Sequence, residues 1–275
     1  MCYDYANKFE TIDYVVIDKN GSHKKTQTIP FETRSMLHEC AITENYVLVL
    51  DLSVTFSLER LGGGYFPFAW DDNHQSRIGL LDRNDESQDV QWFEIDRTYF
   101  FHTFNAYEDK NGDVVVSATA YDRLFDKDRN GPFTESSPHL TRWILDLKSR
   151  RAKSEQLDDR SIEFPRIHPD LVSKSNQFGY ALASSNSKKP DFKEIVKYDF
   201  VNDSSEVYEY GSGNFGAEPV FVPSEGANDE DEGYLLSLVY DQETDKSDLI
   251  ILNAQEVRSG PLAKVHLPQR LSLIH

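Results

Sequence analysis

The chain has 275 residues, 39% of them hydrophobic, and a formal net charge of −18 at pH 7. This apolar content is sufficient for a packed core, so the composition argues against a disordered chain. The acidity argues against nucleic acid as a partner and against purely electrostatic docking on an anionic membrane, because both surfaces carry phosphate groups that would repel the protein.

The predicted elements are short strands that begin close to the amino-terminus. The first ten residues, MCYDYANKFE, lack the basic end and apolar core of a signal peptide, so we expect a cytoplasmic protein. Two cysteines, Cys2 and Cys40, are too few for a disulfide framework, which fits a reducing compartment. Seven runs have the apolar or alternating pattern of strands: 13–18, 45–53, 113–122, 141–147, 194–200, 233–241 and 248–254.

Turn residues separate these runs. Asn-Gly pairs at 20–21 and 111–112 are hairpin signals, and the acidic stretch GANDEDEG at 226–233 is expected to be a solvated turn. No long segment has a helical period, and the longest apolar runs are too short to span a bilayer. The pattern therefore predicts one all-β domain over residues 1–275, as a sandwich, barrel or propeller.

Histidines and glutamates lie together in unusual places. His38 stands between an apolar approach and a strand, His102 closes the aromatic run of FFHTFNAYED, and His275 ends the chain. Taken singly, each would be an ordinary core or surface histidine. Glu163 in SIEFPRI and Glu218 in GAEPVFVP are carboxylates in apolar surroundings that need partners. A metal-bound imidazole needs an acceptor for its second nitrogen, so the two groups together predict a metal site.

Five motifs carry a family resemblance over nearly the whole chain. They are, in order, MLHECAITENY, FHTFNAYED, EFPRI, GAEPVFVPSEGANDEDEGYLLSLVYD and VHLPQRLSLIH. Together they resemble the carotenoid cleavage dioxygenases, a family that also contains stilbene-cleaving dioxygenases and the retinal pigment epithelium isomerohydrolase. The resemblance implies a seven-bladed β-propeller with a non-haem Fe(II) on its axis. Four histidines hold the iron in that family, and three glutamates orient most of these histidines.

The resemblance assigns His38, His102 and His275 to the second, third and fourth iron ligands. His102 would lie at the inner end of a blade strand. Glu39 follows His38 where the family has aspartate. Before His275 only Arg270 is retained from the family pattern.

The resemblance also assigns the carboxylates. Glu163 would accept a hydrogen bond from His102, and Glu218 would accept one from His275. Glu108, in the NAYE part of its motif, is expected to hold a turn rather than to bind metal. His23 lies in a turn and is expected to be exposed. The family's first histidine and its glutamate have no match here, so we expect an incomplete propeller that lacks the amino-terminal blades.

The implied function is Fe(II)-dependent oxidative cleavage of a double bond in a carotenoid or apocarotenoid, with dioxygen as co-substrate. The alternatives are a stilbene-cleaving dioxygenase and an inactive, truncated propeller. A metal hydrolase is a weaker rival, and no Gly-x-Ser-x-Gly elbow supports a serine hydrolase. Residues 58–70, LERLGGGYFPFAW, form either an apolar rim for lipid-soluble substrate, with peripheral membrane contact, or a glycine-bent loop that packs its own aromatics.

Overall fold

The computed structural model describes residues 2–4, 8–31, 34–132, 135–184 and 191–271, and the regular secondary structure within them is almost entirely antiparallel β-strand. The prediction of an all-β chain is confirmed, and each of the seven predicted runs lies within or overlaps a strand. None of the helices in these ranges is long and apolar enough to cross a membrane.

The amino-terminal half forms three sheets and one short helical insertion. The first sheet contains β1 (Cys2–Asp4), β2 (Lys8–Ile17) and β3 (His23–Pro30). The second contains β4 (Tyr46–Asp51), β7 (Arg77–Asp82) and β8 (Gln91–Glu94). Between β4 and β7 the chain forms the two-stranded ribbon of β5 (Val54–Phe56) and β6 (Phe68–Trp70), which encloses α1 (Leu58–Gly62).

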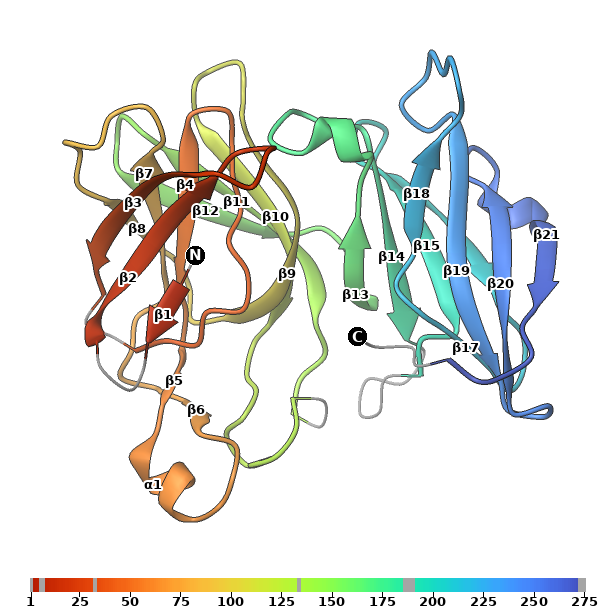
Figure 1. The fold of residues 1–275 in the computed structure, drawn as a ribbon, viewed down its shortest axis with the longest axis horizontal. Coiled ribbons are helices and arrows are strands. Elements are labelled where there is room, and N and C mark those ends of the chain that lie inside the picture. The colour runs from red at the N-terminus through yellow and green to blue at the C-terminus, as the bar shows by residue number, and fades with distance from the viewer. Residues whose placement is uncertain (1, 5–7, 32–33, 133–134, 185–190, 272–275) are drawn as a thin grey trace.

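Two four-stranded meanders follow, and their first strands lie side by side in the middle of the molecule (Figure 1). One contains β9 (Tyr99–Glu108), β10 (Val114–Tyr121), β11 (His139–Asp146) and β12 (Arg151–Gln156). The other contains β13 (Ser161–Arg166), β14 (Phe178–Ser184), β15 (Glu194–Asp199) and β16 (Ser204–Glu209). A 3₁₀ turn, η1 (Pro169–Leu171), separates β13 from β14.

The last sheet contains β17 (Asn214–Gly216), β18 (Val220–Pro223), β19 (Gly233–Asp241), β20 (Lys246–Asn253) and β21 (Pro261–His266), with η2 (Val257–Ser259) before β21. Consecutive hairpins of this kind build the blades of a propeller. All eight residues of β10 are buried, which explains its uninterrupted apolar run, because both faces of that sheet are covered. The predicted Asn-Gly turn joins β9 to β10, where Gly112 has a φ of +83°.

Residues 58–70 combine the two alternatives that the sequence allowed, an exposed apolar rim and a segment that packs its own aromatic side chains. Leu58, Leu61 and Tyr65 are 69%, 53% and 40% exposed, whereas Phe68 and Trp70 are buried. Residues 58–62 form a helical turn rather than an irregular loop, because Ser57 accepts a hydrogen bond from the Arg60 N–H and caps it. We call Leu58, Leu61 and Tyr65 the apolar rim.

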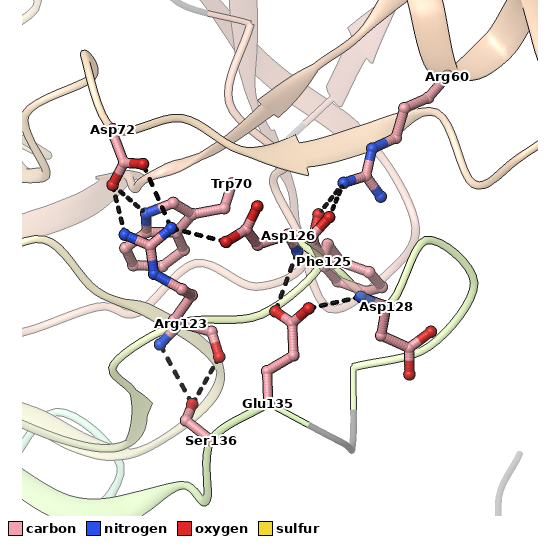
Figure 2. Close-up of polar contacts among 9 residues, drawn as sticks. All are labelled: Arg60, Trp70, Asp72, Arg123, Phe125, Asp126, Asp128, Glu135 and Ser136. Carbon is pink, nitrogen blue, oxygen red and sulfur yellow. Dashed lines mark hydrogen bonds and ion pairs between the residues drawn. The ribbon is translucent and has the colours of Figure 1, made fainter.

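A polar network holds this insertion in place (Figure 2). The buried Arg60 donates through Nη2 to the carbonyl oxygens of Phe125 and Asp126. Glu135 accepts hydrogen bonds from the backbone N–H groups of Asp126 and Asp128, which fixes the loop that carries those carbonyls. The insertion that carries the apolar rim is therefore held in position by hydrogen bonds.

The acidic loop at 226–233 is exposed at Gly226, Asn228 and Asp229, as expected for a solvated turn, but its next two carboxylates make structural contacts. Glu230 accepts hydrogen bonds from the backbone N–H groups of Gln177 and Phe178 in the neighbouring sheet. Asp231 lies 2.6 Å from the ammonium group of Lys197, a side chain only 6% exposed. Two consecutive carboxylates thus join the last two sheets, and the acidic run is a structural contact between them.

We expect Asp231→Asn to lower the free energy of unfolding by about 3–5 kcal/mol, because it leaves the buried Lys197 charge without its counter-ion. Urea denaturation measures this change. The matched control is Asp245→Asn, which alters an exposed ion pair with Arg270 and is expected to have little effect. Equal effects of the two substitutions would show that the buried pair does not stabilise the fold.

Candidate metal centre

The structure brings two of the predicted histidines together from separate segments. His38 lies between β3 and β4, and His102 lies in β9. Their ring centroids are 5.2 Å apart, and the ring planes are nearly perpendicular, at 83°. Phe101 contacts His38 and Phe164 contacts His102, each at a centroid distance of 5.2 Å. The two imidazoles therefore share an aromatic environment.

His102 does not end its strand, contrary to the sequence prediction. It is the fourth residue of β9, and the strand continues through the motif that follows. Asn105 and Phe100 are five steps apart on β9, whereas their partners on β10, Ser117 and Ala120, are only three steps apart. Two extra residues thus bulge from β9 around His102. Bulges of this kind redirect side chains and are frequent next to functional sites.

Glu163 forms a hydrogen bond with the Nδ1 edge of the His102 ring. The Nδ1 of His102 lies 2.7 Å from Oε2 of Glu163, a residue only 3% exposed. The same oxygen accepts the backbone N–H of Phe164 at 2.8 Å, and Oε1 accepts the hydroxyl of Tyr121 at 3.0 Å. With these partners the carboxylate has little freedom. It holds a proton of His102 on Nδ1, so that in the neutral imidazole the lone pair is on Nε2.

A second bulge, in β13, places Glu163. The pairing of β13 with β14 shifts between Glu163 and Arg166. Within this shift Phe164 has a φ of +56°, a left-handed conformation that bulky residues rarely adopt. Such strain persists only where surrounding contacts enforce it, and it is concentrated at functional sites. Here it directs the Phe164 N–H to the carboxylate of the preceding residue.

The two histidines have opposite pKa shifts. Loss of hydration and the nearby His102 lower the pKa of His38, although Glu163 opposes the shift. Burial would lower the pKa of His102 too, but the hydrogen bond and charge of Glu163, with the charges of Glu39 and Glu218, raise it. His38 is thus biased toward the neutral imidazole that binds metals, and His102 is polarised by its carboxylate.

Glu39 joins the His38 segment to β9. Its two carboxylate oxygens accept the backbone N–H and the hydroxyl of Thr103, each at 2.8 Å. Burial raises the pKa of Glu39, while the hydrogen bonds from Thr103 oppose that shift. Sequence reasoning noted Glu39 as a departure from the family pattern but missed this contact. The available signal was the position of Glu39 in the sequence: it directly follows His38, and its partner Thr103 directly follows His102.

Glu108 makes a second junction between the same two segments. It accepts the Thr43 hydroxyl at 2.8 Å and the backbone N–H groups of Glu44 and Asn45 at 3.1 and 3.0 Å. Glu108 was expected to hold the turn that follows it, but Asp109 accepts the hydrogen bonds of that turn, and Glu108 instead holds the bend at 43–45. Contacts of Glu39 and Glu108 therefore align residues 39–45 with β9.

The remaining predicted residues are placed differently. Glu218 forms an ion pair with Arg166 at 2.6 Å, and its expected partner, His275, lies outside the described residues. Arg270 lies over the ring of Tyr240, 4.3 Å from its centroid. His23 is exposed on β3, as expected.

The donor set suits a transition metal as far as the structure describes it. No cluster of three or more His, Cys, Asp or Glu side chains in metal-binding positions occurs among the described residues. The His38 and His102 pair fits a shared metal ion. Two imidazoles that bind the same metal, each through one nitrogen at about 2.1 Å, have neighbouring rings that do not touch, and the ring centroids here are 5.2 Å apart. Imidazole is a suitable ligand for iron and neighbouring metals.

Comparison with known proteins gives one consistent family. The model of the family described as "Retinal pigment epithelial membrane protein" matches residues 1–274. The carotenoid cleavage oxygenase of Mycobacterium tuberculosis is 32% identical over 98% of this chain and 63% of its own length. The isoeugenol monooxygenase of Pseudomonas putida is 30% identical over 94% of this chain and 57% of its own length.

Solved structures of Synechocystis apocarotenoid oxygenase share the fold. One variant has a TM-score of 0.87 and 25% identity over 96% of this chain and 57% of the solved chain. A cobalt-substituted form has a TM-score of 0.84 and 26% identity over 94% of this chain and 56% of the solved chain. The predicted family and propeller fold are confirmed. The chain spans little more than half the length of most of these proteins.

We expect Glu108→Ala to lower the free energy of unfolding by about 1–3 kcal/mol, because three donors in the turn at 43–45 lose a charged acceptor. Urea denaturation measures the change. Glu86→Ala removes an exposed glutamate that pairs with Lys25 and is the control, expected to change stability little. If the two variants were equally stable, the junction made by Glu108 would not stabilise the fold.

Proposed function

Because the chain belongs to the retinal pigment epithelial membrane protein family, we propose that it forms part of a non-haem Fe(II) dioxygenase site. The proposed reaction cleaves one double bond of a carotenoid or apocarotenoid. Dioxygen breaks the C=C bond, and each carbon receives one oxygen atom, so two carbonyl products leave without an external reductant. The observation that carries this proposal is the pair His38 and His102, 5.2 Å apart, with His102 fixed by the buried Glu163.

His38 and His102 would hold the iron, and His275 is the proposed further ligand. A bound Fe(II) would supply the activation of dioxygen that a carbon–carbon double bond needs. Glu163 contributes by holding the Nδ1 proton of His102, so that the lone pair of Nε2 faces away from the carboxylate. Tyr121 and the Phe164 N–H keep that carboxylate in place.

The surroundings of the histidines favour an apolar substrate. Phe101 packs edge-on against both His38 and Tyr121, and Phe164 packs against His102 and Phe192. These rings offer aromatic surface to a polyene beside His38, which is exposed, and His102, which is partly buried. The proposed partners are therefore an apolar alkene and dioxygen.

A second substrate class is an aryl alkene, such as a stilbene. The similarity to a protein named isoeugenol monooxygenase favours it, because that name specifies a small aromatic substrate. Product analysis in air with an apocarotenoid and a stilbene, after loading with Fe(II), distinguishes the two classes. Aldehydes from neither substrate would count against the proposed reaction.

The apolar rim gives lipid-soluble substrate a place to enter. Leu58 and Leu61 belong to α1, which lies at the far end of the insertion in Figure 1, and both side chains are more than half exposed. Shallow insertion of such side chains into a bilayer removes apolar surface from water. We infer peripheral contact with a membrane surface at this rim.

We expect Glu163→Gln to weaken Fe(II) binding about ten- to a hundredfold, since the amide cannot accept the hydrogen bonds of His102, Phe164 and Tyr121 together. Anaerobic equilibrium dialysis measures the affinity. The control is Glu243→Gln, an exposed glutamate in the turn between β19 and β20. Absence of Fe(II) binding by the unmodified chain, or equal affinity of both variants, would contradict the proposed site.

We expect Leu58→Ser combined with Leu61→Ser to reduce sedimentation with neutral phosphatidylcholine vesicles about tenfold, because two leucines no longer leave water. Neutral lipid is the appropriate surface for a chain of net charge −18. Val201→Ser is the control, since Val201 is 71% exposed but lies between β15 and β16. A similar loss with the control would rule out a specific role for the rim.

A further inference from the structure

The residues that directly follow the two histidines are joined to each other by hydrogen bonds. Glu39 directly follows His38 in the chain, and its partner Thr103 directly follows His102. Both oxygens of Glu39 take part, one with the Thr103 N–H and one with its hydroxyl, each at 2.8 Å. The link therefore joins equivalent positions next to the two imidazoles.

The His38 segment depends on side chains for its position. Residues 36–41 belong to no strand, so a continuous ladder of backbone hydrogen bonds does not hold them. Backbone bonds occur at either end of this stretch, from Met36 to Val54 and from Leu48 to Ala41. Between these ends, Glu39 attaches the segment to β9 at the residue after His102.

The facing strand also leaves its regular path at this point. Thr103 lies inside the bulged part of β9, between the two shifts in pairing with β10. A bulge leaves backbone groups outside the ladder, and here the Thr103 N–H is taken up by the carboxylate of Glu39. The same contact thus completes the bulge and places His38.

We propose that Glu39 is a positioning residue that sets the spacing between the His38 and His102 rings. It acts through hydrogen-bond geometry, by holding the backbone next to His38 against the backbone next to His102. Its consequence for metal binding rests on the proposed function, whereas its consequence for ring spacing does not.

The first test measures ring spacing without metal. Histidine labelled with carbon-13 and nitrogen-15 permits detection of the nuclear Overhauser effect between the His38 and His102 rings. We expect this signal in the unmodified chain and in Glu39→Gln, because glutamine can accept the Thr103 N–H and donate to its hydroxyl. We expect its loss in Glu39→Ala. Retention in a folded Glu39→Ala protein would overturn the proposal.

Two further variants guard against misfolding. Glu44→Ala changes an exposed glutamate of the same segment and should leave the ring signal unchanged. Thr103→Val removes only the hydroxyl donor, and we expect it to weaken the signal if Glu39→Ala does not fold. An unchanged signal in Thr103→Val would then count against the proposal.

The second test measures Co(II) affinity, since a cobalt-substituted structure exists for a relative. We expect a loss of about tenfold or more in Glu39→Ala and near-normal affinity in Glu39→Gln, the pattern of a geometric support for a ligand. Equal losses in both variants would show that charge, not positioning, is the contribution. Loss of the ring signal in Glu39→Ala, in a protein that never binds Co(II), would retain the positioning role and reject the metal site.

Discussion

Two carboxylates that join separate chain segments, the buried Glu163 and the partly buried Glu39, hold the candidate site together. Glu163 joins His102, Tyr121 and its own neighbouring backbone, and Glu39 joins the His38 segment to β9. A buried carboxylate without donors would be strongly destabilising. Each of these carboxylates therefore has its hydrogen-bond donors only when the donating segments have folded against it. The site consequently forms only when the sheets have assembled.

The same site requires departures from regular β-structure. A regular ladder alternates side chains between its two faces, so consecutive residues of β9 and β13 could not all serve one point. The extra residues around His102 and the left-handed Phe164 after Glu163 interrupt that alternation. In each strand the irregularity coincides with a residue that contacts the other strand. Irregular backbone and functional side chain are thus parts of one arrangement.

The strands could be predicted from the sequence because their signals are local. Asn111 and Gly112 form the expected hairpin turn, and the apolar run that follows is the buried β10. Bulges leave no comparable local signal, which is why His102 was wrongly expected to close its strand. The contacts of the acidic loop were missed for a related reason. Composition shows charge, but the contact that Asp231 makes depends on Lys197, 34 residues earlier in the chain. Glu39, likewise, acquires its role only through Thr103.

The order of the sheets explains why residues far apart in the chain can serve one place. The first strands of two successive meanders, β9 and β13, are neighbours, and they supply His102 and Glu163, which are 61 residues apart. Glu218 stands just before β18 in the following sheet, and its charge reaches His102. Two meanders thus present their first strands, and the last sheet presents the residues between β17 and β18, toward the same region. In such an arrangement the outermost strands can vary while the inner ones keep the site, because the contacts that His102 and Tyr121 make with Glu163 lie between two sheets rather than within one.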